Sequence, residues 1–390
     1  KVSYLFKNAL DLEPTRPKLW RNWAYVNSAL FAESKVAITK SRSTNKNELE
    51  QKQQFLLNQQ NQDIYANNSL RAFLKMTELV PSDSLEFASQ ILSILSSSSE
   101  QVTSQFINLN LLPSAVINVL PLITSKLDHP DKNINLIIER LLISSSMYYF
   151  QEIYFALNLY IVSNDEKSII AQSIVDKIRN YKINAAEDSD LFIDGMIRCA
   201  LTWFEIWMNS IEEASKFPRQ AYNILTNLFS MYERPQCDLD HLFIRLYDDF
   251  IQNLKADFMN PKSKEIWQKL RTLYNSLTEK VNKLSAIFLS KVSEKLCMKR
   301  GFAINAPGMN FDSLYSSDEF NSNNSNDFNV NNDNDTYNSN NGNNLVNFNS
   351  ENENQIYSIE PVLEVLETQQ HPRCIFINTR KGKKLKYLLK

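Results

Sequence analysis

Residues 372–390 read PRCIFINTRKGKKLKYLLK. Two apolar runs, 372–377 and 385–390, flank a basic segment, 378–384, that contains Gly382. Apolar runs of this length around a glycine-containing segment are typical of two antiparallel strands joined by a turn. The stretch therefore predicts a β-hairpin, and we expect its basic turn at 380–384 to be a solvated tip and not a binding patch.

The chain before residue 300 has a different composition. Its first 194 residues contain no glycine and are rich in Leu, Ile, Asn and Ser, which favours stacked helices over tight turns. We expect a helical hairpin at 2–32 and then amphipathic segments with short connections, as in a TPR/HEAT-like α-solenoid. The segments are 70–79, 85–95, 115–127, 134–143, 150–162 and 168–181. Between them, the Gln- and Asn-rich residues 33–63 are expected to be a disordered insertion, with a polar helix over 48–57 as the alternative.

Residues 186–284 predict an up-down bundle of four longer helices. The expected helices are 189–216, 219–232, 238–257 and 261–283. Trp203 and Trp207 lie at helical spacing, which favours a place in the bundle core. After residue 300 we expect strands at 356–359 and 362–366 and a strand and turn at 304–308. Because 15 of the 30 residues from 321 to 350 are Asn, we expect a disordered insertion at 318–355.

Composition narrows the functional classes. The net charge is −2, with basic residues interleaved with acidic ones, so nothing indicates a nucleic-acid partner. The histidines and cysteines are isolated from one another, which predicts neither a metal site nor a disulfide framework; they are His129, His241, His371, Cys199, Cys237, Cys297 and Cys374. The most apolar run, 111–123, is too short to span a bilayer. We expect a cytoplasmic protein, and because the chain starts at Lys1 without Met, the middle of a longer one.

Several motifs, in order along the chain, resemble one family. Residues 203–207 (WFEIW) and 211–215 (IEEAS) are similar to the "W-H-E-x-W … L-E-E-A-S" helix of the rapamycin-binding bundle of target-of-rapamycin (TOR) kinases. Further similar stretches are 18–24, 120–128, 231–234, 265–267, 292–300, 304–308, 359–365, 370–373 and 387–390. The resemblance implies a mainly α chain that ends in a few β-strands of an incomplete kinase N-lobe. Its expected domains are the end of a FAT solenoid (1–185), an FRB-like bundle (186–284) and the start of the N-lobe (285–390).

The resemblance also implies the chemistry. These kinases transfer the γ-phosphate of ATP to protein Ser/Thr in nutrient and growth signalling, with Mg²⁺, mainly by positioning and charge stabilisation. The catalytic residues and metal ligands of the family fall beyond residue 390, so we expect the chain alone to be inactive. Lys390, at the end of an apolar strand, would pair with the ATP phosphates, and Thr368 and Pro372 would contact the nucleotide. The alternatives are an ordinary surface lysine and a solvated turn.

The ligand groove of the family's bundle would involve Ile211, Ser215, Trp267 and Tyr274. Two of its aromatic positions fall on Arg219 and Arg271 here. Because a guanidinium in an apolar groove loses its hydration, we expect weak or absent binding of an FKBP–rapamycin complex. The alternative for the aromatic side chains is simple core packing.

Partners implied by the resemblance are protein substrates, a WD40-propeller subunit and a HEAT-repeat scaffold subunit, with the complex free in the cytoplasm or peripheral on endomembranes. Three alternatives stay open. The chain could belong to a catalytically dead scaffold of the pseudokinase branch, to an RNA-surveillance kinase of the same superfamily, or to a helical solenoid with no enzymatic role.

Overall fold

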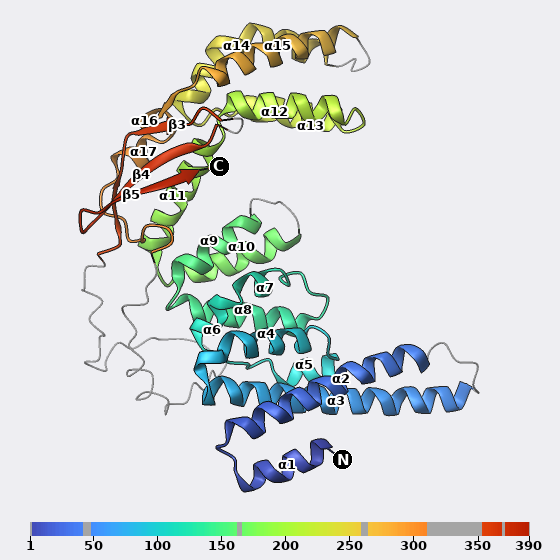
Figure 1. The fold of residues 1–390 in the computed structure, drawn as a ribbon. Helices are drawn as coiled ribbons and strands as arrows, with labels where there is room; N and C mark the ends of the chain where they lie inside the picture. Colours follow the sequence, from blue (N-terminus) through green and yellow to red (C-terminus); the bar gives the residue numbers. More distant parts are fainter. Residues whose placement is uncertain are drawn as a thin grey trace, which may run out of the picture. The chain divides into compact units, whose positions relative to one another are not determined.

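The computed structural model describes residues 2–41, 48–161, 166–258, 264–309, 353–368 and 371–389. The chain forms two compact units, residues 1–186 and 187–390. Most described residues are helical, and a small antiparallel sheet lies at the C-terminal end of the chain (Figure 1). The predicted fold class, a mainly helical chain that ends in a few strands, is confirmed.

The first unit stacks helices in chain order. α2 packs on α3, α3 on α4, α8 on α9 and α9 on α10, and their inward faces form one continuous apolar core. The helices are α1 (Val2–Leu12), α2 (Pro17–Ser41), α3 (Glu48–Leu79), α4 (Ser84–Leu95), α5 (Glu100–Gln105), α6 (Pro113–Asn118), α7 (Leu120–Thr124), α8 (Lys132–Ser146), α9 (Phe150–Ile161) and α10 (Glu166–Arg179), with a 3₁₀ turn at Pro81–Asp83. The predicted helical segments are therefore present, although 115–127 divides into α6 and α7.

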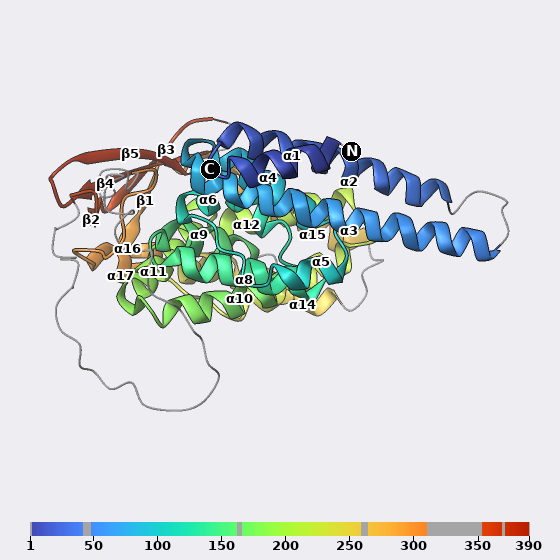
Figure 2. The same cartoon turned by 90° about the horizontal axis from the view of Figure 1, so that it is seen from below.

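The predicted disordered insertion at 33–63 is wrong for the residues that the structure describes there. Residues 33–41 continue α2, and residues 48–63 form the first half of α3. The two helices run side by side in both views (Figures 1 and 2), and Ser69 Oγ of α3 donates a hydrogen bond of 3.0 Å to the Ala24 carbonyl of α2. Gln, Glu, Lys and Leu are good helix formers, so a helix anchored by its packed half extends through a polar half at little cost.

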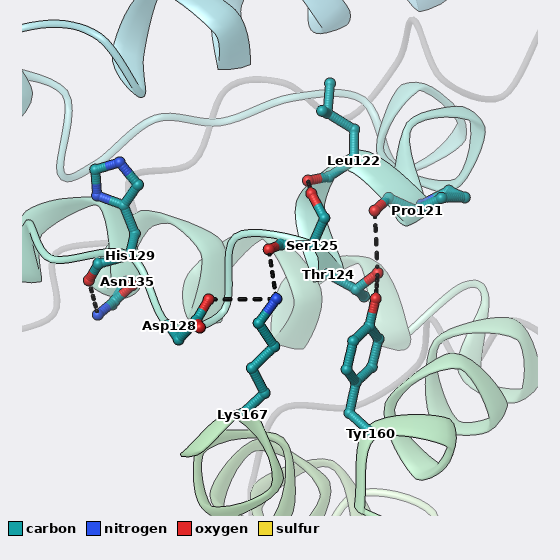
Figure 3. Close-up of polar contacts among 9 residues, drawn as sticks. All are labelled: Pro121, Leu122, Thr124, Ser125, Asp128, His129, Asn135, Tyr160 and Lys167. Atoms are coloured by element: carbon teal, nitrogen blue, oxygen red, sulfur yellow. Dashed lines mark hydrogen bonds and ion pairs between the residues drawn. The ribbon is translucent and has the colours of Figure 1, made fainter. Parts of the chain in front are cut away.

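Polar contacts hold α10 to the elements before it in the first unit (Figure 3). Lys167 Nζ donates a 2.9 Å hydrogen bond to the Ser125 carbonyl and lies 3.4 Å from Asp128 Oδ1. The Tyr160 hydroxyl of α9 donates to Thr124 Oγ1 at 3.3 Å. Because Ser125 and Asp128 follow α7, the cation of α10 satisfies a carbonyl near the end of that helix.

The second unit contains a helix, α11, followed by four helices, α12 to α15, that share one apolar core and form a bundle. They are α11 (Ile183–Ala200), α12 (Trp203–Lys216), α13 (Ala221–Tyr232), α14 (Asp238–Asp257) and α15 (Lys264–Asn282). The predicted single helix 189–216 is wrong, because the chain breaks between α11 and α12. Thr202 caps the new helix: its backbone N–H and its hydroxyl donate to Glu205 Oε2 at 3.0 and 2.9 Å. A Thr and a Glu three residues apart are a signal for a helix start.

Trp203 and Trp207 lie in the bundle core, as predicted, with exposed fractions of 7% and 0%. α12 packs against α13, α14 and α15, so it contacts each of the other bundle helices. None of the described helices has the length and apolar composition needed to cross a bilayer.

The sheet is built around β4, the first strand of the C-terminal hairpin. β4 pairs with β5 along its length, while its other edge pairs with β3 near Arg373 and with β2 near Ile377; β1 pairs with β3. All pairs are antiparallel. The elements are β1 (Ala286–Phe288), α16 (Leu289–Val292), α17 (Glu294–Met298), β2 (Ile356–Ile359), β3 (Val362–Val365), β4 (Arg373–Thr379) and β5 (Lys384–Leu389). Gly382 has φ of 79° in the hairpin turn, a conformation that favours glycine.

The sequence also predicted a strand and turn at 304–308 and a disordered insertion at 318–355. Of the strand and turn predicted at 304–308, the strand is reduced to an isolated bridge between Asn305 and Gln355, and the turn is present at 307–308. The predicted Asn-rich insertion, 318–355, lies outside the described residues except for 353–355. The predicted hairpin and the strands at 356–359 and 362–366 are confirmed.

Candidate functional site

The connection between β3 and β4 carries the residues predicted to contact a nucleotide. Hydrogen bonds close it at its base: Leu366 N donates to the Pro372 carbonyl at 2.9 Å, and His371 N donates to the Thr368 carbonyl at 3.0 Å. His371 has φ of 42°, in the left-handed region that few side chains adopt. Thr368 is exposed and Pro372 is buried. The structure therefore places Thr368 and Pro372 in the same connection between β3 and β4, with Thr368 exposed to solvent.

The strand β5 ends beside this loop. Leu389 pairs with Arg373, the first residue of β4, so the chain leaves β5 at the end of the sheet where the loop begins. Lys390, predicted to bind phosphate, lies outside the described residues. Among the described residues of the loop, only His371 can carry a positive charge. The Leu366, Thr368 and His371 amides already donate within the loop, and Glu367 adds a carboxylate, so the described residues offer the Thr368 hydroxyl. A strong cation for a phosphate chain has to come from a neighbouring segment.

The basic side chains of β5 have other contacts. Lys384 lies over the Phe376 ring at 4.4 Å from its centroid and is 2.6 Å from Glu360 Oε1. Lys386 lies over the same ring at 5.7 Å. Residues 380–384 are exposed, and Lys381 forms an ion pair with Glu353. These contacts place the Lys384 and Lys386 charges over the β4 face, away from the loop sequence itself.

Arg373 links the loop to the bundle. Its guanidinium donates to Glu205 Oε2 and to the His371 carbonyl, and the exposed fractions of the two charged side chains are 2% and 7%. Burial raises the pKa of the neighbouring Cys199 thiol to about 12, while the Arg373 charge acts in the opposite direction. This contact could not be predicted from the sequence. Both residues lie in motifs that resemble the TOR family, but 168 positions separate them and no pattern in one sequence joins them.

The predicted ligand groove has its residues on two packed helices. Ile211 and Ser215 are on α12, Trp267 and Tyr274 are on α15, and the two helices contact each other. Ile211 is buried, Trp267 and Tyr274 are half-buried, and Ser215 is exposed. The pKa of Lys216, at the end of α12, is raised by its hydrogen bond to Glu212 and also by the nearby Tyr274.

The two arginines lie at the borders of this region. Arg219 is in the connection after α12, and Arg271 is one helical turn beyond Trp267 on α15; both are exposed. Each guanidinium is hydrated here, so a ligand that covered either one would have to displace that water. Among the described residues, no group of three or more His, Cys, Asp or Glu side chains could hold a metal ion.

Comparison with known proteins shows which proteins this chain resembles. Residues 195–286 match the sequence model of the FKBP12-rapamycin binding domain. The serine/threonine-protein kinase mTor of Drosophila melanogaster is 21% identical over 414 residues, which covers 99% of this chain and 15% of that protein. TOR2 of Saccharomyces cerevisiae is 22% identical over 423 residues, covering 100% of this chain and 16% of the relative. TOR of Oryza sativa subsp. japonica is 25% identical over 218 residues, covering 51% of this chain and 8% of the relative.

These matches confirm the resemblance to TOR kinases along the whole chain. The chain spans about 15% of the length of the Drosophila relative. The matched domain, 195–286, contains α12 to α15 and all four predicted groove residues.

Proposed function

We propose that this chain is the regulatory and ATP-lobe part of an atypical serine/threonine protein kinase of the TOR kind. Residues 1–185 would be the C-terminal part of the FAT solenoid, 186–284 the FRB-like bundle and 285–390 the start of the kinase N-lobe. The observation that carries the proposal is the second compact unit, in which the matched bundle continues directly into an antiparallel sheet with a closed loop beside the end of β5.

In this proposal the whole protein transfers the γ-phosphate of ATP to protein Ser/Thr hydroxyls in nutrient and growth signalling. Thr368 would donate its hydroxyl to a phosphate oxygen, Pro372 would fix the loop behind it, and Lys390, which follows Leu389 in the chain, would supply the cation. Mg²⁺ neutralises charge on the phosphates when it is bound. Because the chain spans about 15% of the Drosophila relative, the catalytic groups and metal ligands would come from the rest of the protein.

The decisive experiment measures phosphate transfer by the full-length protein. With Mg²⁺-ATP and a panel of Ser/Thr peptides, we expect phosphate incorporation by the full-length protein and none by the 390-residue chain alone. Nucleotide binding without transfer would instead support the catalytically dead scaffold. An RNA-surveillance kinase is less well supported, because the reported relatives are TOR kinases.

Partners follow from the same proposal. We infer a WD40-propeller subunit and a HEAT-repeat scaffold subunit in a TOR-type complex, located in the cytoplasm or peripherally on endomembranes. Affinity purification of the full-length protein, followed by mass spectrometry, would recover both subunit types; the repeated absence of both would contradict the inference.

Rapamycin binding provides a separate test of the groove. We expect the chain to bind an FKBP12–rapamycin complex weakly, because Arg219 and Arg271 stand where an apolar ligand needs aromatic contacts. The double substitution Arg219→Phe with Arg271→Tyr is expected to raise the affinity at least about tenfold, or about 1.4 kcal/mol. Titration calorimetry on the 390-residue chain measures it.

The matched control is Arg245→Tyr, an equivalent change at an exposed position of α14. It should leave the affinity unchanged. Tight binding by the unsubstituted chain, or no gain in the double variant, would contradict the role assigned to the two arginines.

A further inference from the structure

The contact between Glu205 and Arg373 joins two parts of the second unit that have different expected roles. Glu205 is in the first turn of α12, and Arg373 is the first residue of β4. A buried carboxylate and a buried guanidinium are stable only when both are paired and hydrogen-bonded. Glu205 Oε2 accepts from Arg373 and from two donors of Thr202, so the helix cap and the ion pair share one oxygen atom.

Arg373 also contacts the loop. A second amino group of the same guanidinium donates to the carbonyl of His371, the residue with the left-handed backbone. A strained conformation of this kind persists only when its surroundings hold it. The chain of contacts therefore runs from the start of α12, through Glu205 and Arg373, to His371 and the closed base of the loop.

The sheet has an independent attachment to the helices through α17 and the segment after it, where Gly301 N and Phe302 N donate to the carbonyls of Tyr357 and Ile356 in β2. Asp188 Oδ1 of α11 is 2.8 Å from Lys299 Nζ, and its Oδ2 accepts a 2.7 Å hydrogen bond from Ala303 N. Gly195 of α11 lies so close to Leu296 that a Cβ atom would be 2.2 Å from Leu296 Cδ2. Loss of the Glu205–Arg373 pair should therefore loosen the loop without detaching the sheet.

We propose that Arg373 is a positioning residue. Through its ion pair with Glu205, the first turn of the bundle helix α12 sets the conformation of the connection between β3 and β4, the loop predicted to contact a nucleotide. This inference deepens the proposed function and rests on it for the identity of the ligand, the phosphate chain of Mg²⁺-ATP. A change in the cap of α12 is transmitted to Thr368 and His371 because one carboxylate oxygen serves both the cap and the ion pair.

The test compares substitutions that separate loop position from general stability. Glu205→Gln keeps a carbonyl acceptor for the Thr202 donors, since Gln also suits this capping position, but leaves Arg373 without a counter-ion. The double variant Glu205→Gln with Arg373→Met removes both charges, and neutral replacement of a buried pair commonly restores stability. Lys299→Met is the matched control, because it removes the ion pair with Asp188 and leaves Glu205 and Arg373 in place.

Amide hydrogen exchange on the 390-residue chain gives the first readout. We expect the amides of Leu366, Thr368 and His371 to exchange about tenfold faster in Glu205→Gln and in the double variant. In Lys299→Met the change should appear at Ala303 and not in the loop. A double variant with wild-type thermal stability and still-fast loop exchange supports positioning. Loop exchange that is unchanged in the folded Glu205→Gln variant overturns it.

Kinetics of the full-length protein give the second readout. The double variant is expected to raise the KM for ATP about tenfold with a smaller change in kcat, because a displaced loop misplaces the nucleotide. An unchanged KM in a folded double variant with full activity overturns the inference. If the wild-type protein transfers no phosphate, the proposed function fails, and the exchange experiment still decides whether the ion pair positions the loop.

Discussion

Trp207→Ala is expected to destabilise the bundle by about 3–5 kcal/mol, the range found when a buried Trp or Phe is truncated to Ala. The exposed fraction of Trp207 is 0%. Its ring lies 6.0 Å from Phe229, 6.1 Å from Tyr232 and 5.7 Å from Phe243, centroid to centroid. These rings come from α13 and α14, so the cavity would open between three helices. Urea unfolding of the 390-residue chain, followed by circular dichroism, measures the loss.

Two further substitutions separate the cavity from the loss of an indole. Trp207 Nε1 is buried without a hydrogen-bond partner, so Trp207→Phe removes no hydrogen bond and keeps an aromatic ring in place. We expect it to lose less than about 1.5 kcal/mol. Trp267→Ala, at a half-buried site, should lose about 1 kcal/mol. Equal losses for Trp207→Ala and Trp267→Ala would contradict the central place assigned to Trp207.

The parts of the fold that the sequence predicted well are those with local signals. The hairpin follows from Gly382 between two apolar runs, and the solenoid helices follow from apolar residues at helical spacing. Composition was a poorer guide at 48–63, where a polar sequence continues a helix that is packed further along. The break between α11 and α12 contains neither Pro nor Gly, so the run appeared continuous. The Thr202–Glu205 spacing was nevertheless present as a signal for a helix start.

In the candidate site, too, the residues in local motifs could be predicted and the long-range contact could not. The groove residues could be assigned to two helices from motifs alone, because each motif is short and continuous. The pairing of Glu205 with Arg373 could not, since it depends on how the sheet docks against α11 and α12. Long-range contacts of this kind are set by tertiary packing and leave no periodic trace in a single sequence.

Lys390→Met in the full-length protein is expected to lower kcat/KM for phosphate transfer about 10²–10³-fold, the loss typical of removing one electrostatic group from a reaction centre. The reason is the composition of the loop: its described residues offer the Thr368 hydroxyl but no lysine or arginine. Lys390 directly follows Leu389, whose partner in the sheet is Arg373 at the end of the loop. Steady-state kinetics with varied ATP measure the change.

Lys386→Met is the matched control, because it removes the same charge four positions earlier in the chain, at a residue that lies over Phe376. We expect its kinetics to stay within about twofold of wild type, as for most surface substitutions. Lys390→Arg should also be impaired, since the guanidinium fork does not reproduce a compact ammonium. Full activity in Lys390→Met would remove this lysine from the mechanism and leave the kinase proposal standing. Equal losses at Lys386 and Lys390 would indicate that the net charge of residues 384–390, and not one lysine, governs nucleotide binding.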